Sequence, residues 1–160
     1  MNLPPELRTN PNRITGDEGE TALIAAIRDG DTERVKNLLR HPAIDVNRAD
    51  DHNRTPLWWA AFEGRTEAVR MLLAERDINV NKTCISSFGD GQPFRNTTPL
   101  YMAARHNHTD IVRMLVERPD TDLNVLQCNG FSALGVALNK GHLGAAAILE
   151  QAGAHHAKPM

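Results

Sequence analysis

The chain has few of the residues that mark several common protein classes. It contains only two cysteines, Cys84 and Cys128, and no Cys-x-x-Cys pair, so neither a disulfide framework nor a zinc ribbon is expected. No apolar run approaches the ~18 residues of a membrane-spanning helix, and the first residues hold no apolar signal-peptide segment. We therefore expect two thiols in a reducing, intracellular and cytoplasmic setting. Delivery into a host cell by a signal that is not cleaved is compatible with these absences.

The chain also has little excess of one charge sign. The 160 residues carry a formal net charge of -2, and the isoelectric point is near 6.4. Such a balance gives no overall attraction to nucleic acid or to an anionic membrane, so neither is an expected partner. No Ser/His/Asp set, glycine-rich phosphate loop or paired carboxylate stands out. We expect no catalytic site, no metal and no cofactor.

What the chain does contain is a pattern that occurs four times. The clearest copy is residues 53–81, which runs from Thr-Pro-Leu through Ala-Ala and Gly to Asn-Val-Asn. One column of the repeat holds Thr21, Thr55, Thr98 and Ser132; a second holds Leu23, Leu57, Leu100 and Leu134; a third holds Ala26, Ala60, Ala103 and Ala137; a fourth holds Asn47, Asn81 and Asn124. The steps between the Thr/Ser positions are 34, 43 and 34 residues. A fixed period in this range is typical of stacked repeat proteins.

Each copy predicts two helices. Threonine is a good N-cap, and a proline at the first helical position loses an N–H that the helix could not use. A glycine such as Gly30 then separates the first helix from the second. In the first copy Val35, Leu38 and Leu39 have the i, i+3, i+4 spacing of one buried stripe, which predicts a second helix from about Thr32 to Arg40. Extended segments then lead to the next copy, and we expect them to form projecting β-turn hairpins, or fingers.

These motifs resemble the ankyrin repeat family. The match is strongest at Thr55-Pro56-Leu57 with Ala60-Ala61, and at Thr98-Pro99-Leu100 with Ala103-Ala104. The resemblance implies an all-α solenoid of stacked helix-turn-helix repeats with β-turn hairpin fingers, and it implies no catalytic activity. The chain departs from the usual period of about 33 residues and lacks the family's histidine after Thr-Pro-Leu. Nine extra residues lie within the finger at 82–96.

The expected organisation has three parts. Residues 1–16 form a polar N-terminal leader, residues 17–154 form four repeats (about 17–49, 50–83, 94–126 and 127–154), and residues 155–160 form a C-terminal tail. In the second helices, two columns are polar only in the first repeat, and one, which ends at Glu150, is polar only in the fourth. Terminal repeats need polar outer faces. We therefore expect a complete four-repeat array.

By the pattern of the resembled family, partner contacts come from the concave face, at positions just before the Thr and just after the Ala pair. Together with the aromatic residues and the long finger, they give the candidate partner-binding set: Asp51, His52, Arg54, Trp58, Phe62, Glu63, Phe88, Phe94, Arg95, Tyr101, Arg105, His106, Phe131, Asn139 and Lys140. Phe62 is the sharpest candidate, because the other repeats have polar residues in its column and exposed aromatics dominate binding hot spots. Trp59 is expected in the core between repeats.

Several candidates also have a purely structural explanation. Phe62 could pack on the neighbouring finger, and the extra finger residues could be a tolerated insertion. His108 and His142 share a repeat column with Asp31 and Arg65, which favours a structural role over metal binding.

The leading functional hypothesis is a non-catalytic module that binds another protein through its concave face, as an adaptor, an inhibitor or an effector, and is monomeric alone. The alternative is a structural protein that dimerises through the C-terminal repeat and tail. An enzyme or metalloprotein is a third, weaker hypothesis.

Overall fold

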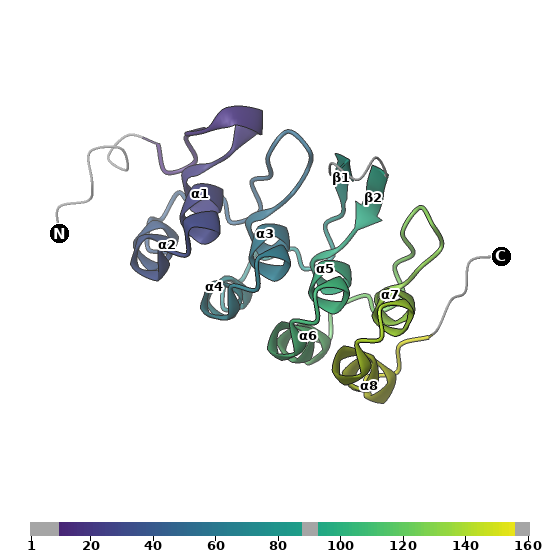
Figure 1. Cartoon of the computed structure of the whole chain (residues 1–160). Helices are drawn as coiled ribbons and strands as arrows, with labels where there is room; N and C mark the ends of the chain where they lie inside the picture. Colours follow the sequence, from purple (N-terminus) through teal and green to yellow (C-terminus); the bar gives the residue numbers. More distant parts are fainter. Residues whose placement is uncertain (1–9, 88–92, 156–160) are drawn as a thin grey trace.

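The computed structural model describes residues 10–87 and 93–155, which form a row of four helix pairs (Figure 1). The first helices of the pairs are α1 (Ala22–Asp29), α3 (Pro56–Phe62), α5 (Pro99–Arg105) and α7 (Ala133–Asn139). The second helices are α2 (Thr32–Leu39), α4 (Thr66–Leu73), α6 (Thr109–Val116) and α8 (Leu143–Gln151). This order confirms the expected all-α solenoid of helix-turn-helix repeats.

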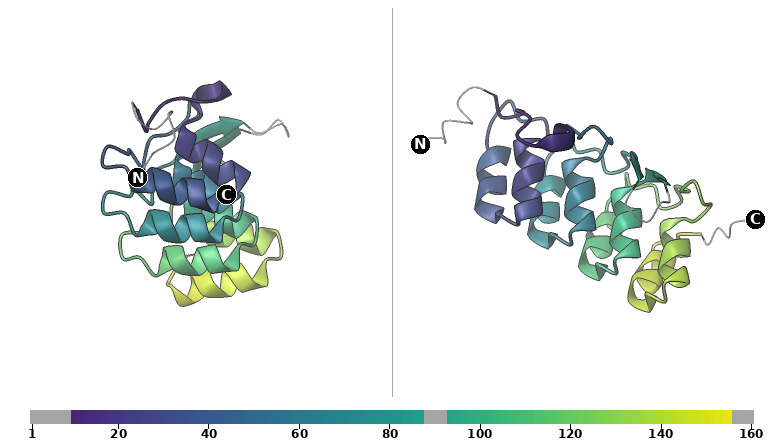
Figure 2. Two further views of the ribbon diagram at one scale, coloured as in Figure 1. Left: turned by 90° about the vertical axis from the view of Figure 1, so that its left-hand side faces the viewer. Right: turned by 45° about the horizontal axis from the view of Figure 1, so that its top comes forward.

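The helices lie in two layers. Figures 1 and 2 show the first helices in one row and the second helices in a parallel row, with the first and fourth repeats at opposite ends of the array. The fingers are the segments that precede each first helix, and they project from the layer of first helices. A short 3-10 turn, Asp17–Gly19, lies in the finger before α1.

The finger between the second and third repeats contains the two-stranded sheet. Strand β1 (Cys84–Ser87) pairs antiparallel with β2 (Pro93–Thr97), with an irregular register between Cys84 and Ile85. Asn96 lies at this irregularity with a φ of 67°. The extra residues of the insert therefore lengthen one finger into a hairpin and leave the stack of helices uninterrupted.

The predicted caps are present at every first helix. Thr21, Thr55, Thr98 and Ser132 each precede their helix, and each hydroxyl oxygen accepts a hydrogen bond from the backbone N–H three residues later, at 3.1–3.2 Å. Such a cap contributes about 1 kcal/mol of stability. The turn into each second helix needs a left-handed residue, which is glycine in three repeats and Asn107, with a φ of 59°, in the third.

Apolar side chains from both layers fill the space between neighbouring repeats. The leucine column of the first helices is almost completely buried, and Val69, Val112 and Leu149 of the second helices have no exposed surface. Trp59 is 4% exposed, which confirms its place in the core. A single repeat could not bury this surface, so the stack as a whole stabilises each member.

Polar side chains join consecutive repeats at the base of the fingers. The Asn81 amide donates to the Asp120 carbonyl (2.7 Å) and accepts from the backbone N–H of Asp122 (2.8 Å) in the next repeat. Asn47 makes the same two contacts with Asp77 and Asn79. The asparagine column therefore carries a hydrogen-bonded rung between repeats.

A hydrogen-bonded rung in the first finger corrects the expected N-terminal leader, residues 1–16. Asn12 donates to the Ala43 carbonyl (2.8 Å) and accepts from the Asp45 N–H (2.7 Å), as the other asparagines do. Pro11 is buried, and Ile14 forms a β-bridge with Thr21. Residues 10–16 thus belong to the first finger, because they supply its rung and its bridge. The rest of the leader, residues 1–9, lies outside the described residues.

Replacement of the central rung tests its contribution. We expect Asn81→Ala to lower the free energy of unfolding by about 1–2 kcal/mol, because two inter-repeat hydrogen bonds are lost. Urea unfolding followed by circular dichroism measures the change. Asn37→Ala, at an exposed site on α2, is the matched control and should change stability by less than about 0.5 kcal/mol. Equal stability of the two variants would contradict the role of the rung.

Candidate functional site

The concave face, defined here as the surface of the fingers and the first helices, contains the candidate residues. Seven of them have exposed or half-buried side chains at the ends of first helices and in the fingers. They are Asp51, His52, Glu63, Arg105, His106, Asn139 and Lys140. Phe62 and Phe131 are half-buried and pack against the core with one side. The structure therefore leaves these nine side chains accessible from the concave face.

Two aromatic candidates are buried instead, so their predicted place on the concave surface is wrong. Trp58 is 0% exposed, and its indole Nε1 donates to the Thr97 hydroxyl at 3.1 Å. Tyr101 is 2% exposed, and its hydroxyl donates to Gln127 Oε1 at 2.6 Å. The finger of the following repeat covers each ring and supplies the partner for its polar end. Sequence columns could not reveal this cover, because it comes from the next repeat.

Arg54 is a third correction, since it is also buried. Its Nε donates to Asp50 Oδ2 at 2.6 Å, and its Nη2 donates to Glu18 Oε2 at 2.7 Å. The Asp50 carboxylate also accepts from the Trp59 indole at 3.0 Å. A buried charge is costly unless several groups pair with it and hydrogen-bond to it, as they do here. Arg54 therefore ties the first finger to the second rather than offering its charge to a partner.

The Trp59 ring contacts two arginine side chains, Arg28 and Arg54. The guanidinium carbons of Arg54 and Arg28 lie 4.5 and 4.6 Å from the centre of a Trp59 ring. Arg28 also pairs with Glu20 at 2.7 Å. Cation–π contacts of this kind contribute up to about 2 kcal/mol when desolvated. The Arg54 guanidinium also holds the pKa of the Glu18 carboxyl below its usual value, by hydrogen bond first and by charge second.

Three candidates in the long finger cannot be placed. Phe88 lies outside the described residues. Phe94 and Arg95 have described backbones in β2, but their side chains lie outside the description. Their contribution to binding stays a prediction.

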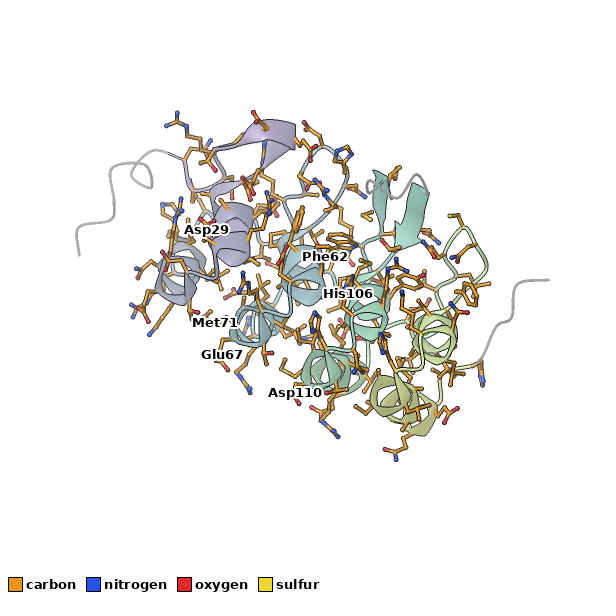
Figure 3. The ribbon with its side chains drawn as sticks, viewed as in Figure 1. Asp29, Phe62, Glu67, Met71, His106 and Asp110 are labelled. Carbon is orange, nitrogen blue, oxygen red and sulfur yellow. The ribbon has the colours of Figure 1, made fainter. Side chains whose placement is uncertain are left out.

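Phe62 lies at the junction of the second and third repeats. Its ring stacks on Trp58, with centres 5.3 Å apart and planes 12° from parallel, and it meets the edge of Trp59 at 5.8 Å. The His106 ring of the next repeat contacts it edge-on at 4.9 Å. Figure 3 shows Phe62 and His106 on adjacent first helices, whereas Glu67 and Asp110 lie on the layer of second helices. Phe62 is thus fixed in position by ring contacts and stays half-buried.

His106 is held mainly as a neutral imidazole. Partial burial of its ring is the first cause that lowers its pKa from 6.5 to about 4, and the nearby His108, Arg105 and Lys140 lower it further. The rings of His106 and His108 are nearly parallel, with centres 6.0 Å apart. A proton on His106 would lie beside these basic groups.

A cleft of about 550 Å³ opens between the ends of α5 and α7. Its lining is polar and mostly basic, and consists of Arg105, His106, Asn139, Lys140 and His142. Four of these five residues are predicted contact residues, and the structure brings them together. His142 was assigned a structural role, and it does have one.

The column of His142 connects each repeat to the preceding one. His142 Nε2 lies 3.1 Å from the Arg105 carbonyl oxygen, and His108 Nε2 lies 3.2 Å from that of Phe62. Arg65 donates to the Arg28 carbonyl at 2.7 Å. These contacts satisfy carbonyls at the ends of first helices, which lack helical partners. They support the structural interpretation of the column.

Two organising features were missed in the sequence. Asp50 was not among the candidates, although it anchors Arg54 and Trp59 at the base of the second finger. Asn53 and Asn96 occupy one repeat column with left-handed backbones, and each donates to a carbonyl of the next finger (Thr83 at 2.6 Å, Leu126 at 2.7 Å). The signal was a Gly/Asn column two residues before each Thr or Ser, since these residues tolerate a positive φ best.

No group of three or more His, Cys, Asp or Glu side chains in residues 10–87 and 93–155 is placed to hold a metal ion. Within the same ranges, no helix is both long and apolar enough to cross a membrane.

A family model described as ankyrin repeats (3 copies) matches residues 4–84 and 85–159. The chain therefore belongs to the ankyrin repeat family. No curated protein matches it. Ankyrin repeats are generally protein–protein interaction modules, and the family is typically non-catalytic.

The lowered pKa of His106 leads to a testable prediction. Because the pKa falls from 6.5 in the unfolded chain to about 4 in the folded chain, the unfolded state binds more protons between these values. The contribution of His106 to stability is therefore complete above pH 6.5 and is lost as the pH falls toward 4. An NMR titration of the His106 ring in the folded protein should give a midpoint near 4. The same titration in urea is the control, and a folded-state midpoint near 6.5 would refute the assignment.

Proposed function

We propose that this chain is a non-catalytic module that binds one protein partner through its concave face and acts by occupying that partner, as an adaptor, an inhibitor or an effector. The proposed contact residues are the nine accessible candidates, with Phe62 and His106 at the centre. We propose a cytoplasmic setting for this interaction. Arg54, Trp58 and Tyr101 are left out, because they are buried.

The observation that carries the proposal is the junction of the second and third repeats. Phe62 is a large apolar side chain that is fixed by Trp58 and Trp59 and still partly accessible. The polar side chains of Arg105 and His106 lie beside it on α5 and its C-cap. An anchored aromatic residue surrounded by polar groups is typical of a binding hot spot, where one residue supplies about 2 kcal/mol or more. Anchoring also reduces the entropy that is lost on binding.

Self-association through the last repeat is the second candidate function, and one observation favours it. Leu143 at the start of α8 is 72% exposed, and Leu138 of α7 is 36% exposed. Sedimentation velocity over a wide concentration range tests this candidate. A mass of 17.7 kDa at every concentration would exclude it, whereas a dimer that Leu143→Glu dissociates would support it.

Capture of partners from cell extract tests the concave face. We expect Phe62→Ala with Arg105→Ala to reduce partner recovery at least about tenfold, because a hot-spot contact is lost. The matched control is Glu67→Ala with Arg113→Ala, two exposed residues of second helices, and it should keep the wild-type partners. Thermal melting of each variant confirms that it is folded. Recovery of the same proteins in equal yield with both double variants would refute the concave-face proposal.

A further inference from the structure

A cavity lies between the first two repeats, beside the turns that join their helices. Its volume is about 260 Å³, and residues of α1, α2 and α4 line it (Figure 1). Ala26, Ile27, Val35 and Ala68 make the lining mostly apolar, and Gly30 and Arg65 belong to the same lining. A cavity of about 150 Å³ is enough to hold benzene. The cavity between these repeats is therefore large enough for a small organic molecule.

The half-buried Arg65 guanidinium has no counter-ion among the described residues. Its Nη2 donates to the Arg28 carbonyl at 2.7 Å, and its Nε is buried with no acceptor in the described part of the chain. No carboxylate of residues 10–87 and 93–155 pairs with it. Removing a charge from water is costly unless an opposite charge compensates it. An anion in the cavity would supply that compensation.

Gly30 shows where the remaining amino nitrogen of Arg65 lies. A Cβ added at residue 30 would lie 3.0 Å from Arg65 Nη1 and 3.2 Å from its Cζ, so the guanidinium covers Gly30 in the cavity lining. Because Nη2 is already bonded and Nε is buried, Nη1 is the donor that an anion in the cavity can reach. The charge is delocalised over the planar group, so a carboxylate at Nη1 compensates all of it.

The later junctions between repeats have a different residue at this position. His108 and His142 follow Arg65 in the same column, and each lies beside a carbonyl oxygen of the preceding repeat. At the second junction the His108 ring comes close enough to Gly64 that an added Cβ would lie 2.7 Å from its Cε1. The contact with the preceding repeat therefore does not by itself require the permanent charge of Arg65.

The first turn of α4, residues 66–68, also lines the cavity. No side chain caps this helix, whereas Asp31 caps α2 by accepting from the Arg34 N–H at 2.9 Å. The N–H groups and the dipole at such a helix start favour an anion. Glu67 belongs to the same turn and pairs with Arg70 at 3.4 Å. Its carboxylate disfavours a ligand with two or three negative charges, so the cavity suits a single charge.

From these contacts we infer that the cavity between the first two repeats binds a small organic acid, with a single carboxylate and an apolar body of a few carbons. The carboxylate accepts a hydrogen bond from Arg65 Nη1 and lies near the first turn of α4. The apolar body contacts Ala26, Ile27 and Val35. This site goes beyond the proposed partner contacts and does not depend on them.

An NMR titration of the full-length protein with benzoate at pH 8 tests the inference. We expect the backbone amides of residues 30 and 65–68 to shift most, with saturation at about millimolar benzoate. Benzamide has the same apolar body without the charge, and it should bind at least about tenfold more weakly, because a charge-assisted hydrogen bond is lost.

Two variants remove the guanidinium. Arg65→His should weaken benzoate binding at least about tenfold, because an imidazole is uncharged at pH 8. The fold should be kept, since the next two repeats have histidine in this column. Arg65→Gln keeps an N–H donor for the Arg28 carbonyl and should have the same effect. Arg113→His, at an exposed site on α6, is the matched control and should weaken binding less than about twofold, because an exposed charge elsewhere is screened.

Several results would overturn the inference. They are the absence of a saturable shift, shifts centred away from residues 30 and 65–68, equal binding of benzamide, and tighter binding of inorganic phosphate. Equal weakening by Arg65→His and Arg113→His would also overturn it. Thermal melting shows whether each variant is folded. If neither Arg65 variant folds, the comparison of benzoate with benzamide and phosphate on the unmodified protein decides the matter.

Discussion

The structure depends on burial of apolar surface between successive repeats. Each helix pair is too small to form its own core, and the leucine and alanine columns are buried because another repeat lies against them. Alanine and other small residues in the first helices allow this close approach. The regular spacing of the exposed residues on the concave face follows from the regular spacing of the buried ones.

Polar contacts then fix how each repeat is placed on its neighbour. The asparagine rungs join the finger bases, and the column of Arg65, His108 and His142 joins the ends of first helices to the next repeat. All of these contacts run from a side chain of one repeat to the backbone of another. They therefore depend on repeat position more than on the identity of the residue contacted. This leaves the remaining surface residues free to vary between proteins of the family, which is the basis of different partner choice on one scaffold.

The candidate site was predicted in part. The positions after the Ala pair were exposed as the repeat pattern indicated, and Arg105, His106, Asn139 and Lys140 came together in one cleft. The aromatic residues were harder to interpret. Trp58, Trp59 and Phe62 follow one another within a single helix, yet the first two are buried and the third is partly accessible. The next finger covers Trp58 through Thr97, and the His106 ring of the next repeat contacts Phe62 edge-on while Phe62 stays half-buried.

The sequence alone determined the repeat number, the helix pairs, their caps and the buried columns, because these depend on local propensity and on a period that repeats along the chain. Only the tertiary structure decided which candidate side chains remain accessible, since cover for Arg54, Trp58 and Tyr101 comes from a finger 26 or more residues away. Arg54 illustrates the point: its position just before Thr55 suggested an exposed binding residue, but Glu18 of the first finger joins Asp50 and Trp59 in enclosing it. Long-range packing of this kind has no local signature, and it separates the accessible candidate residues from the core.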